Sequence, residues 1–188
     1  MKKIRPISTV AGFALVFALN GVPTAYAGDT VCVGTLGAVT IDGSVAVPDG
    51  RTCTLKGTRV KGNVFVYTGA TLTANRVQVE GNIQTEGARE VNVNPGSVVG
   101  GNIQIKQGRA ARIKQVQIGG DLQFDENRGA LSALDNEIDG NLQAVKNTGG
   151  LTISYNVIEG ALQCKENSPP PRGTGNVAGD KEGQCARL

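Results

Sequence analysis

Apolar and polar residues alternate in short segments along most of the chain, and the segments repeat. In seven of them an aliphatic residue stands two positions before and two positions after a recurring glycine. The residues before the glycine are Ile41, Val60, Val79, Val99, Ile118, Ile138 and Ile158, and those after it are Val45, Val64, Ile83, Ile103, Leu122, Leu142 and Leu162. A spacing of two places both columns on one face of a β-strand. The pattern therefore predicts strands rather than helices.

The glycine belongs to a phrase that returns every 19 or 20 residues. Gly101-Asn-Ile-Gln-Ile105 is one copy, and the others begin at Gly43, Gly62, Gly81, Gly120, Gly140 and Gly160. A fixed period of this length is typical of stacked repeat architectures. The chain holds 27 glycines, and each would destabilise a helix by roughly 1 kcal/mol relative to alanine.

Each repeat has room for three short strands and three turns. Further apolar-polar-apolar runs lie in mid-repeat, for example at residues 91–93 and 151–153. One repeat cannot bury its apolar face alone, so stacking supplies the core. We predict an all-β, single-domain, right-handed parallel β-helix (a solenoid) of about seven coils of 19–20 residues, formed by residues 41–166. Residues 28–40 are expected to cap one end, and residues 167–188, which begin with a proline- and glycine-rich stretch, the other.

The first 27 residues have the features of a secretory signal peptide. A basic start at residues 2–5 precedes an apolar run at residues 10–19 and a small-residue cleavage site, Ala25-Tyr-Ala27. Polar residues interrupt the run from Asn20 on, before it reaches the ~20 apolar residues that a membrane span needs. We expect a secreted or periplasmic protein that has no membrane span in its mature form.

The four cysteines fall into two pairs with the same spacing. Cys32 and Cys53 are 21 residues apart, and so are Cys164 and Cys185. This gap is about one coil, so each pair can lie on adjacent coils, where strands are ~4.8 Å apart and within the Cα separation that a disulfide needs. Of the three possible connectivities, this one fits the repeat. We predict disulfides that staple the two ends of the solenoid in an oxidising compartment.

Charge composition argues against a nucleic-acid-binding protein. The full chain carries 19 basic and 16 acidic residues, and three of the basic ones lie in the predicted signal. A nucleic-acid footprint would need a net basic domain. Lys106, Arg109, Arg112 and Lys114 do cluster within one coil. We interpret them as a solvated turn, with an anion-binding patch as the alternative.

Few residues offer catalytic chemistry, and we expect no enzyme activity, cofactor or metal site. The chain has no histidine, the commonest general base and metal ligand. Coils of uniform length leave no inserted loops to wall a cleft. The densest carboxylates are Asp121, Asp125, Glu126, Asp135 and Asp139. They could hold a glycosidase pair, as in polysaccharide-cleaving β-helices, but we interpret them as solvated outward positions.

Glutamine recurs three positions after the glycine in the last five coils. The column consists of Gln84, Gln104, Gln123, Gln143 and Gln163, and a column of Asn63, Asn82, Asn102, Asp121 and Asn141 lies two residues earlier. Stacked amides can form ladders that stabilise the coils, as in cross-β structures. Alternatively, a flat and regular amide surface could bind a polysaccharide.

The apolar-x-Gly-x-apolar pattern of residues 41–164 resembles the coils of bactofilins, the polymer-forming solenoid proteins of the bacterial cytoskeleton. The resemblance implies stacking into open-ended polymers. The chain departs from it in its signal sequence and its paired cysteines. Coils such as Gly160-Ala-Leu-Gln-Cys164 are also similar to those of exported bacterial β-solenoid repeat proteins, a likeness that implies no activity.

The sequence thus predicts a non-catalytic solenoid with a structural or surface-interaction role in a cell envelope or matrix. Its expected partners are an envelope polysaccharide or further copies of itself. The alternative function is a polysaccharide-binding module that uses the glutamine and asparagine columns. A polysaccharide-cleaving enzyme ranks third.

Overall fold

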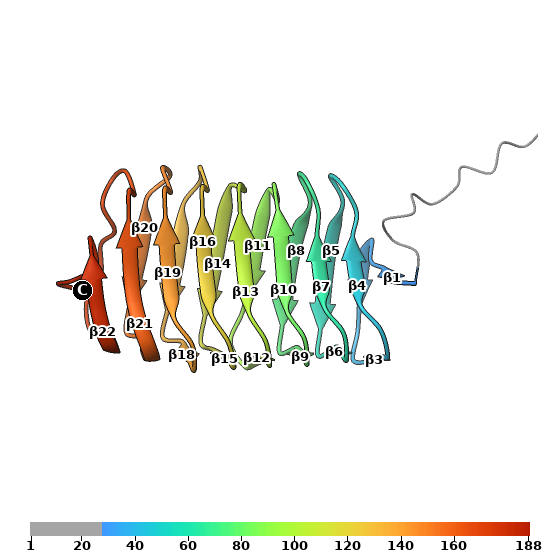
Figure 1. Ribbon diagram of the computed structural model, residues 1–188. Coiled ribbons are helices and arrows are strands. Elements are labelled where there is room, and N and C mark those ends of the chain that lie inside the picture. Colours follow the sequence, from blue (N-terminus) through green and yellow to red (C-terminus); the bar gives the residue numbers. More distant parts are fainter. Residues whose placement is uncertain (1–27) are drawn as a thin grey trace, which may run out of the picture.

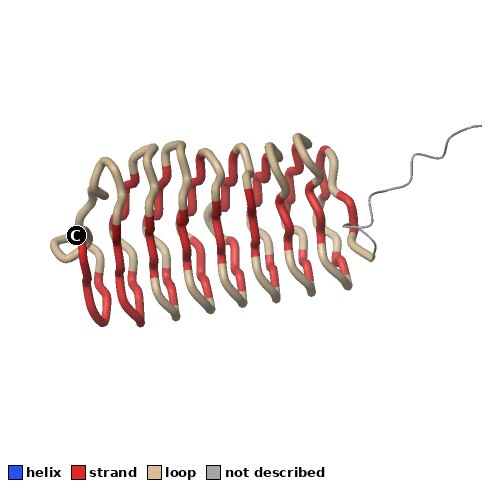
Figure 2. Tube along the Cα trace, turned by 45° about the horizontal axis from the view of Figure 1, so that its top comes forward, coloured by secondary structure: helices blue, strands red, loops and turns tan. Residues whose placement is uncertain are grey.

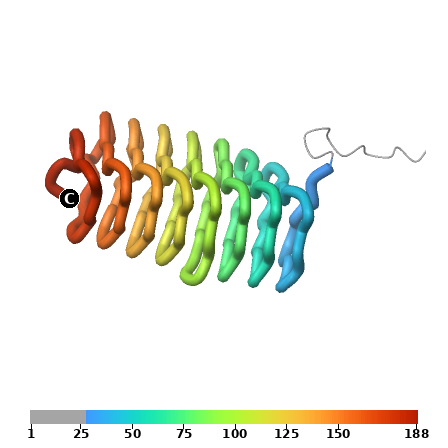
Figure 3. Tube along the Cα trace, turned by 60° about the horizontal axis from the view of Figure 1, so that its bottom comes forward, coloured from blue at the N-terminus to red at the C-terminus, as the bar shows by residue number. Residues whose placement is uncertain are grey.

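The computed structural model describes residues 28–188 and forms a rod of stacked parallel coils (Figure 1). The predicted signal peptide, residues 1–27, lies outside the described residues. The described part contains strands and turns only, without a helix (Figure 2). About eight turns stack along the axis, in agreement with the expected parallel β-solenoid (Figure 3).

Each coil contributes strands to three walls, and every strand pairs with its equivalents in the neighbouring coils. The first wall contains β1 (Thr30–Val31), β4 (Val45–Val47), β7 (Val64–Val66), β10 (Ile83–Glu86), β13 (Ile103–Lys106), β16 (Leu122–Asp125) and β19 (Leu142–Val145). The second contains β2 (Gly34–Leu36), β5 (Thr52–Lys56), β8 (Thr71–Asn75), β11 (Glu90–Val93), β14 (Ala110–Lys114), β17 (Leu131–Leu134) and β20 (Leu151–Ser154). The third contains β3 (Thr40–Ile41), β6 (Arg59–Val60), β9 (Gln78–Val79), β12 (Ser97–Val99), β15 (Val116–Ile118) and β18 (Glu137–Ile138). Two longer strands, β21 (Val157–Lys165) and β22 (Val177–Gly183), run through the third and first walls at the C-terminal end.

The aliphatic columns of the sequence form the core. Of the fourteen predicted inward positions, thirteen are buried, and only Ile41, in the first complete coil, is partly exposed. The register is that of the repeat: Ile103 pairs with Ile83 on one side and with Leu122 on the other. Inward residues of the second wall, such as Leu72 and Ile113, complete the core. Alternate residues of each strand therefore pack inward, and the strands run parallel because each coil repeats the same path.

Two of the three corners use a residue with positive φ. At the corner between the first and second walls, the equivalent residues with positive φ include Gly87, Gln107, Glu126, Lys146 and Glu166. At the next corner they include Arg76, Gln115, Asp135 and Tyr155. Positive φ is unfavourable for residues other than glycine. Its recurrence at equivalent positions shows that the bend is imposed by the stack and not by local preference.

The ends extend further than expected. Within residues 28–40, β1 and β2 already pair with β4 and β5. Residues 167–176 contain no strand, but β22 then adds a rung by pairing with β21 over most of its length. The C-terminal segment therefore both continues the ladder and closes it. These extra rungs raise the predicted seven coils to about eight turns.

Candidate functional site

The asparagine column on the first wall is a ladder between side chains and main chain. The Oδ1 atom of each member accepts a hydrogen bond from the backbone N–H of the equivalent residue in the next coil. Asn82 N donates to Asn63 Oδ1 at 2.8 Å, Asn102 N to Asn82 Oδ1 at 2.7 Å, and Asp121 N to Asn102 Oδ1 at 2.7 Å. The ladder continues through Asp121 and Asn141 to the N–H of Ala161.

This ladder explains the recurring glycine. A Cβ on Gly81 would lie 2.5 Å from Asn63 Oδ1 and 2.7 Å from the carbonyl oxygen of Gly62. Real Cβ atoms do not approach so closely. Glycine is therefore required at this position, because the side-chain amide of the preceding coil occupies the space that a Cβ would need. A glycine within a strand often marks such a close approach.

The glutamine column is in register along five coils, as predicted. Gln84, Gln104, Gln123, Gln143 and Gln163 pair in sequence, and all are partly buried. Side chains of Gln104 and Gln143 donate to the next glutamine, both at 3.2 Å. Gln123 instead donates to Asp121 Oδ2 at 3.3 Å, so the hydrogen-bonded chain is interrupted.

Shallow hollows lie at both ends of the glutamine column. One, of about 290 Å³, is lined by residues that include Phe65, Tyr67, Gln84 and Gln104. The other, of about 360 Å³, lies between Gln143, Gln163 and Glu182. Phe65 precedes Gln84 in register and Glu182 follows Gln163, so an aromatic ring and a carboxylate bound the amide column.

Two further asparagine ladders are buried, and neither was predicted from the sequence. One consists of Asn127, Asn147 and Asn167 and the other of Asn136, Asn156 and Asn176, all at most 5% exposed. In the first, Asn147 Oδ1 accepts from the backbone N–H of Asn127 at 3.0 Å, and its Nδ2 donates to the carbonyl oxygen of Phe124 at 2.9 Å. The spacing of 20 residues was the available signal.

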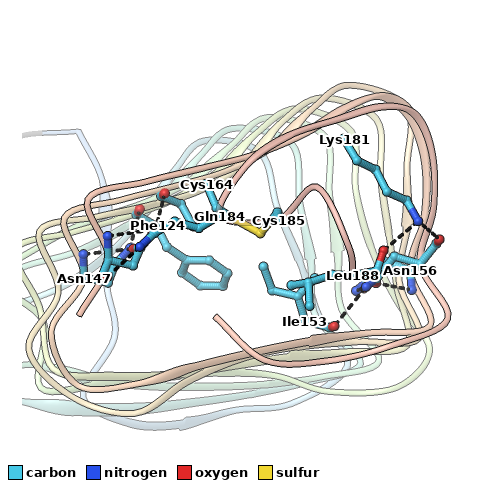
Figure 4. The surroundings of a disulfide bond; sticks show 12 residues. Phe124, Asn147, Ile153, Asn156, Cys164, Lys181, Gln184, Cys185 and Leu188 are labelled. Carbon is cyan, nitrogen blue, oxygen red and sulfur yellow. Dashed lines mark hydrogen bonds between the residues drawn. A yellow bond between two sulfur atoms is a disulfide. The ribbon is translucent and has the colours of Figure 1, made fainter. Parts of the chain in front are cut away.

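The C-terminal segment ends both buried ladders (Figure 4). Gln184 Oε1 accepts from the backbone N–H of Asn167 at 2.8 Å, and Gln184 Nε2 donates to the carbonyl oxygen of Asn167. Lys181 Nζ donates to the main-chain oxygens of Asn176 and Leu188 at 2.7 and 2.6 Å. These side chains satisfy groups that an additional coil would otherwise satisfy.

Both predicted disulfides are present. Cys32–Cys53 joins the first two coils, with Cα atoms 5.6 Å apart, and Cys164–Cys185 joins the last two, with Cα atoms 5.3 Å apart. All four cysteines are buried. In Figure 4 the second disulfide lies between the two buried ladders. The disulfides indicate that the described part of the chain folds in an oxidising, non-cytoplasmic environment.

The five carboxylates considered for catalysis occupy separate positions. Asp121 belongs to the asparagine ladder, where its Oδ1 accepts from the backbone N–H of Asn141 at 2.7 Å. Asp125 ends β16 and Glu126 lies at the following corner, whereas Asp135 lies at the next corner and Asp139 after β18. Glu126 is paired with Lys146, at 3.8 Å between Oε1 and Nζ. The other four side chains therefore point outward at three different places on the coil: Asp125 and Glu126 at one corner, Asp135 at the next, and Asp139 after the third wall.

One exposed ion pair perturbs the titration of its members. Lys61 Nζ lies 2.8 Å from Asp42 Oδ1. The hydrogen bond and the positive charge of Lys61 lower the pKa of Asp42, and the same contact raises the pKa of Lys61.

Among residues 28–188, no cluster of three or more potential metal-ligating side chains occurs. Nor does that part of the chain contain a helix that could cross a membrane.

The basic cluster of the sequence is divided between walls. Lys106 ends β13 on the first wall, Arg109 lies at the corner, and Arg112 and Lys114 point outward from β14 on the second wall.

Comparisons of the chain with protein families, with curated proteins and with solved structures found no match.

Proposed function

We propose that the protein is an exported, non-catalytic solenoid with a structural or surface-interaction role in the cell envelope or its surrounding matrix. The observation that carries this proposal is a rigid, regular rod whose two terminal coils are each joined to their neighbours by a disulfide. Such a rod displays the same outward positions at ~4.8 Å intervals along its length. A repeating surface suits a repeating partner, such as an envelope polymer.

The lack of a catalytic role is supported by the positions of the polar groups. Asp121 is held in a ladder, and the outward carboxylates are distributed around the coil. Each hollow on the first wall has one carboxylate in its lining, Glu182 in one and Glu86 in the other, so neither contains a pair of carboxyl groups. A glycosidase would need two carboxyl groups facing one another across a bound sugar.

Co-sedimentation with insoluble envelope material from the producing cells tests the proposal. Oxidised protein comprising residues 28–188 should sediment with the material and release no new reducing ends from it. Protein that stays in the supernatant would remove the surface-interaction role. Release of reducing ends that Asp125→Asn abolishes would establish the enzyme in its place.

A second candidate is a polysaccharide-binding module on the glutamine column. It is favoured by the in-register amides and by the hollow that places Phe65 and Tyr67 beside Gln84 and Gln104. Aromatic rings next to amides suit the apolar and hydroxyl faces of a neutral sugar. The triple variant Gln104→Ala, Gln123→Ala, Gln143→Ala should remain folded and lose binding to neutral glycans on an array. Unchanged binding would limit the column to its ladder role.

A further inference from the structure

The corner between the first and second walls carries a column of arginines. Arg89, Arg109 and Arg128 lie on three consecutive coils. The backbone N–H of Arg109 donates to the carbonyl oxygen of Ala88 at 2.9 Å, and that of Arg128 to Gly108 at 2.9 Å. These bonds place the three residues in register, at the ~4.8 Å spacing of stacked strands. In Figure 1 this corner follows the tips of β10, β13 and β16.

The three arginines line one hollow on the outside of the rod. It has a volume of about 610 Å³ and is also lined by Thr68, Gln107 and several glycines, including Gly87 and Gly108. A second hollow, of about 490 Å³, shares Gln107 and Arg128 with the first and is also lined by Glu126, Lys146 and Thr148. Together they span the coils from Thr68 to Thr148, which corresponds to roughly 20 Å along the axis.

The guanidinium groups are available to a ligand. All three arginines are exposed, and among the described residues none forms an ion pair. Arg89 Nε donates to Thr71 Oγ1 at 3.1 Å, which leaves its terminal nitrogens free of any hydrogen bond within residues 28–188. The carboxylate of Glu126 already has partners: it accepts from Gln107 at 3.0 Å and lies 3.8 Å from Lys146 Nζ.

Hydrogen bonds from buried asparagine side chains fix the backbone at the arginines. The backbone N–H of Gly108, which precedes Arg109, donates to Asn127 Oδ1 at 2.9 Å. Asn127, which precedes Arg128, donates its own backbone N–H to Asn147 Oδ1 at 3.0 Å. The first buried ladder thus fixes the corner at both arginines. A preorganised site loses little conformational entropy when a ligand binds.

We propose that this corner is a binding site for a linear anionic polysaccharide, whose carboxylate or sulfate groups pair with Arg89, Arg109 and Arg128. The arginine fork matches the geometry of such oxyanions. With one arginine per coil, the positive charges repeat along the rod. They can therefore pair with the regularly spaced negative charges of a polysaccharide that lies parallel to the rod axis. Single-stranded nucleic acid fits less well, because it is bound largely by stacking on aromatic rings, and neither hollow has an aromatic residue in its lining.

The site is separate from the glutamine column and does not depend on the proposed function. Neutral glycans are the expected ligands of the glutamine column, whereas this corner requires charge. The test therefore uses purified polymers. Calorimetric titration of oxidised residues 28–188 with polygalacturonate and with heparin should detect binding that weakens as salt is raised. Dextran, which is neutral, should not bind at this corner.

The decisive comparison is between two variants of equal net charge. Arg109→Gln/Arg128→Gln should weaken polyanion binding by roughly tenfold or more, because each arginine makes a charge-assisted hydrogen bond. Lys56→Gln/Lys114→Gln removes two charges from the outer face of the second wall and should change polyanion binding less than about threefold, as expected for charges remote from the site. Equal losses in the two variants would show unspecific attraction, and absence of binding by the unaltered protein would remove the site.

A second measurement covers the case in which the arginine variant does not fold. Amide chemical shifts of the unaltered protein, titrated with polygalacturonate, should change at residues 107–109 and 126–129 and not on the third wall. Shifts elsewhere would overturn the assignment. Tighter binding of single-stranded DNA than of either polysaccharide would identify a nucleic-acid site instead.

Discussion

Replacement of Asn147 by alanine tests whether the buried ladder stabilises the rod. Asn147 is 1% exposed, and its side chain makes four hydrogen bonds. Its loss leaves the backbone N–H of Asn127 buried without a partner and removes the side chain's other three hydrogen bonds. The unpaired N–H costs about 1–3 kcal/mol and each other lost bond adds about 0.5–1.5 kcal/mol, so we expect the free energy of unfolding to fall by more than about 2 kcal/mol.

Asn141→Ala is the matched control. Asn141 lies in the same coil, and it also accepts from a backbone N–H, that of Ala161 at 2.9 Å. It is only partly buried, so water can replace the lost amide, and we expect a cost below about 1.5 kcal/mol. Equilibrium unfolding of both oxidised variants in guanidinium chloride, followed by circular dichroism, gives the comparison. Equal costs would refute the argument that burial of the ladder sets its contribution.

Three further predictions concern single positions. Thr85→Val should raise stability by about 1 kcal/mol, because Thr85 Oγ1 is buried without a hydrogen-bond partner between Val66 and Ile105, and a lower unfolding midpoint would contradict this. Gly120→Ala should cost about 1–3 kcal/mol, because its Cβ would clash with Asn102 Oδ1, whereas Gly43→Ala, with no atom nearer than 3.7 Å, should have little effect in the same assay. In Lys61→Gln, NMR titration should show the pKa of Asp42 raised relative to the unaltered protein, and an unchanged pKa would exclude Lys61 as the cause. The pH dependence of stability follows from these two shifts. The stabilisation from Asp42 is present above the pKa that Asp42 has in the unfolded chain, and it is lost as pH falls through the lowered pKa of the folded protein. The stabilisation from Lys61 is present below the pKa that Lys61 has in the unfolded chain, and it is lost as pH rises through the raised pKa of the folded protein.

The repeat allowed much of the fold to be predicted. Two aliphatic columns at strand spacing place the core, and the equal gaps between the cysteines place both disulfides one coil apart. These features depend only on the period of the chain. The strand β22 was not predicted, because the proline- and glycine-rich stretch before it interrupts the pattern, and the chain returns to the ladder through tertiary contacts.

The hydrogen-bonding details required the structure. The register of the glutamine column follows from its period, but the turn of Gln123 toward Asp121 depends on the choice between two nearby acceptors. Asn127 and Asn147 directly follow charged residues at exposed corners. A polar side chain at such a position is expected to face solvent, but both asparagines face inward. The arginine column has the period of the repeat, but its members are 19 or 20 residues apart and form no cluster in the sequence until the coils stack.

The solenoid is expected to exist as a discrete rod, because residues 177–188 close its C-terminal end and a disulfide fastens each end. Light scattering of the oxidised protein, residues 28–188, measures this directly. We expect a mass of one chain that does not change with concentration, because Gln184, Lys181 and the Cys164–Cys185 disulfide occupy the C-terminal end and Cys32–Cys53 fastens the other. Growth of the oxidised protein into long fibres would show that the ends are open to stacking and would make a structural polymer the leading interpretation.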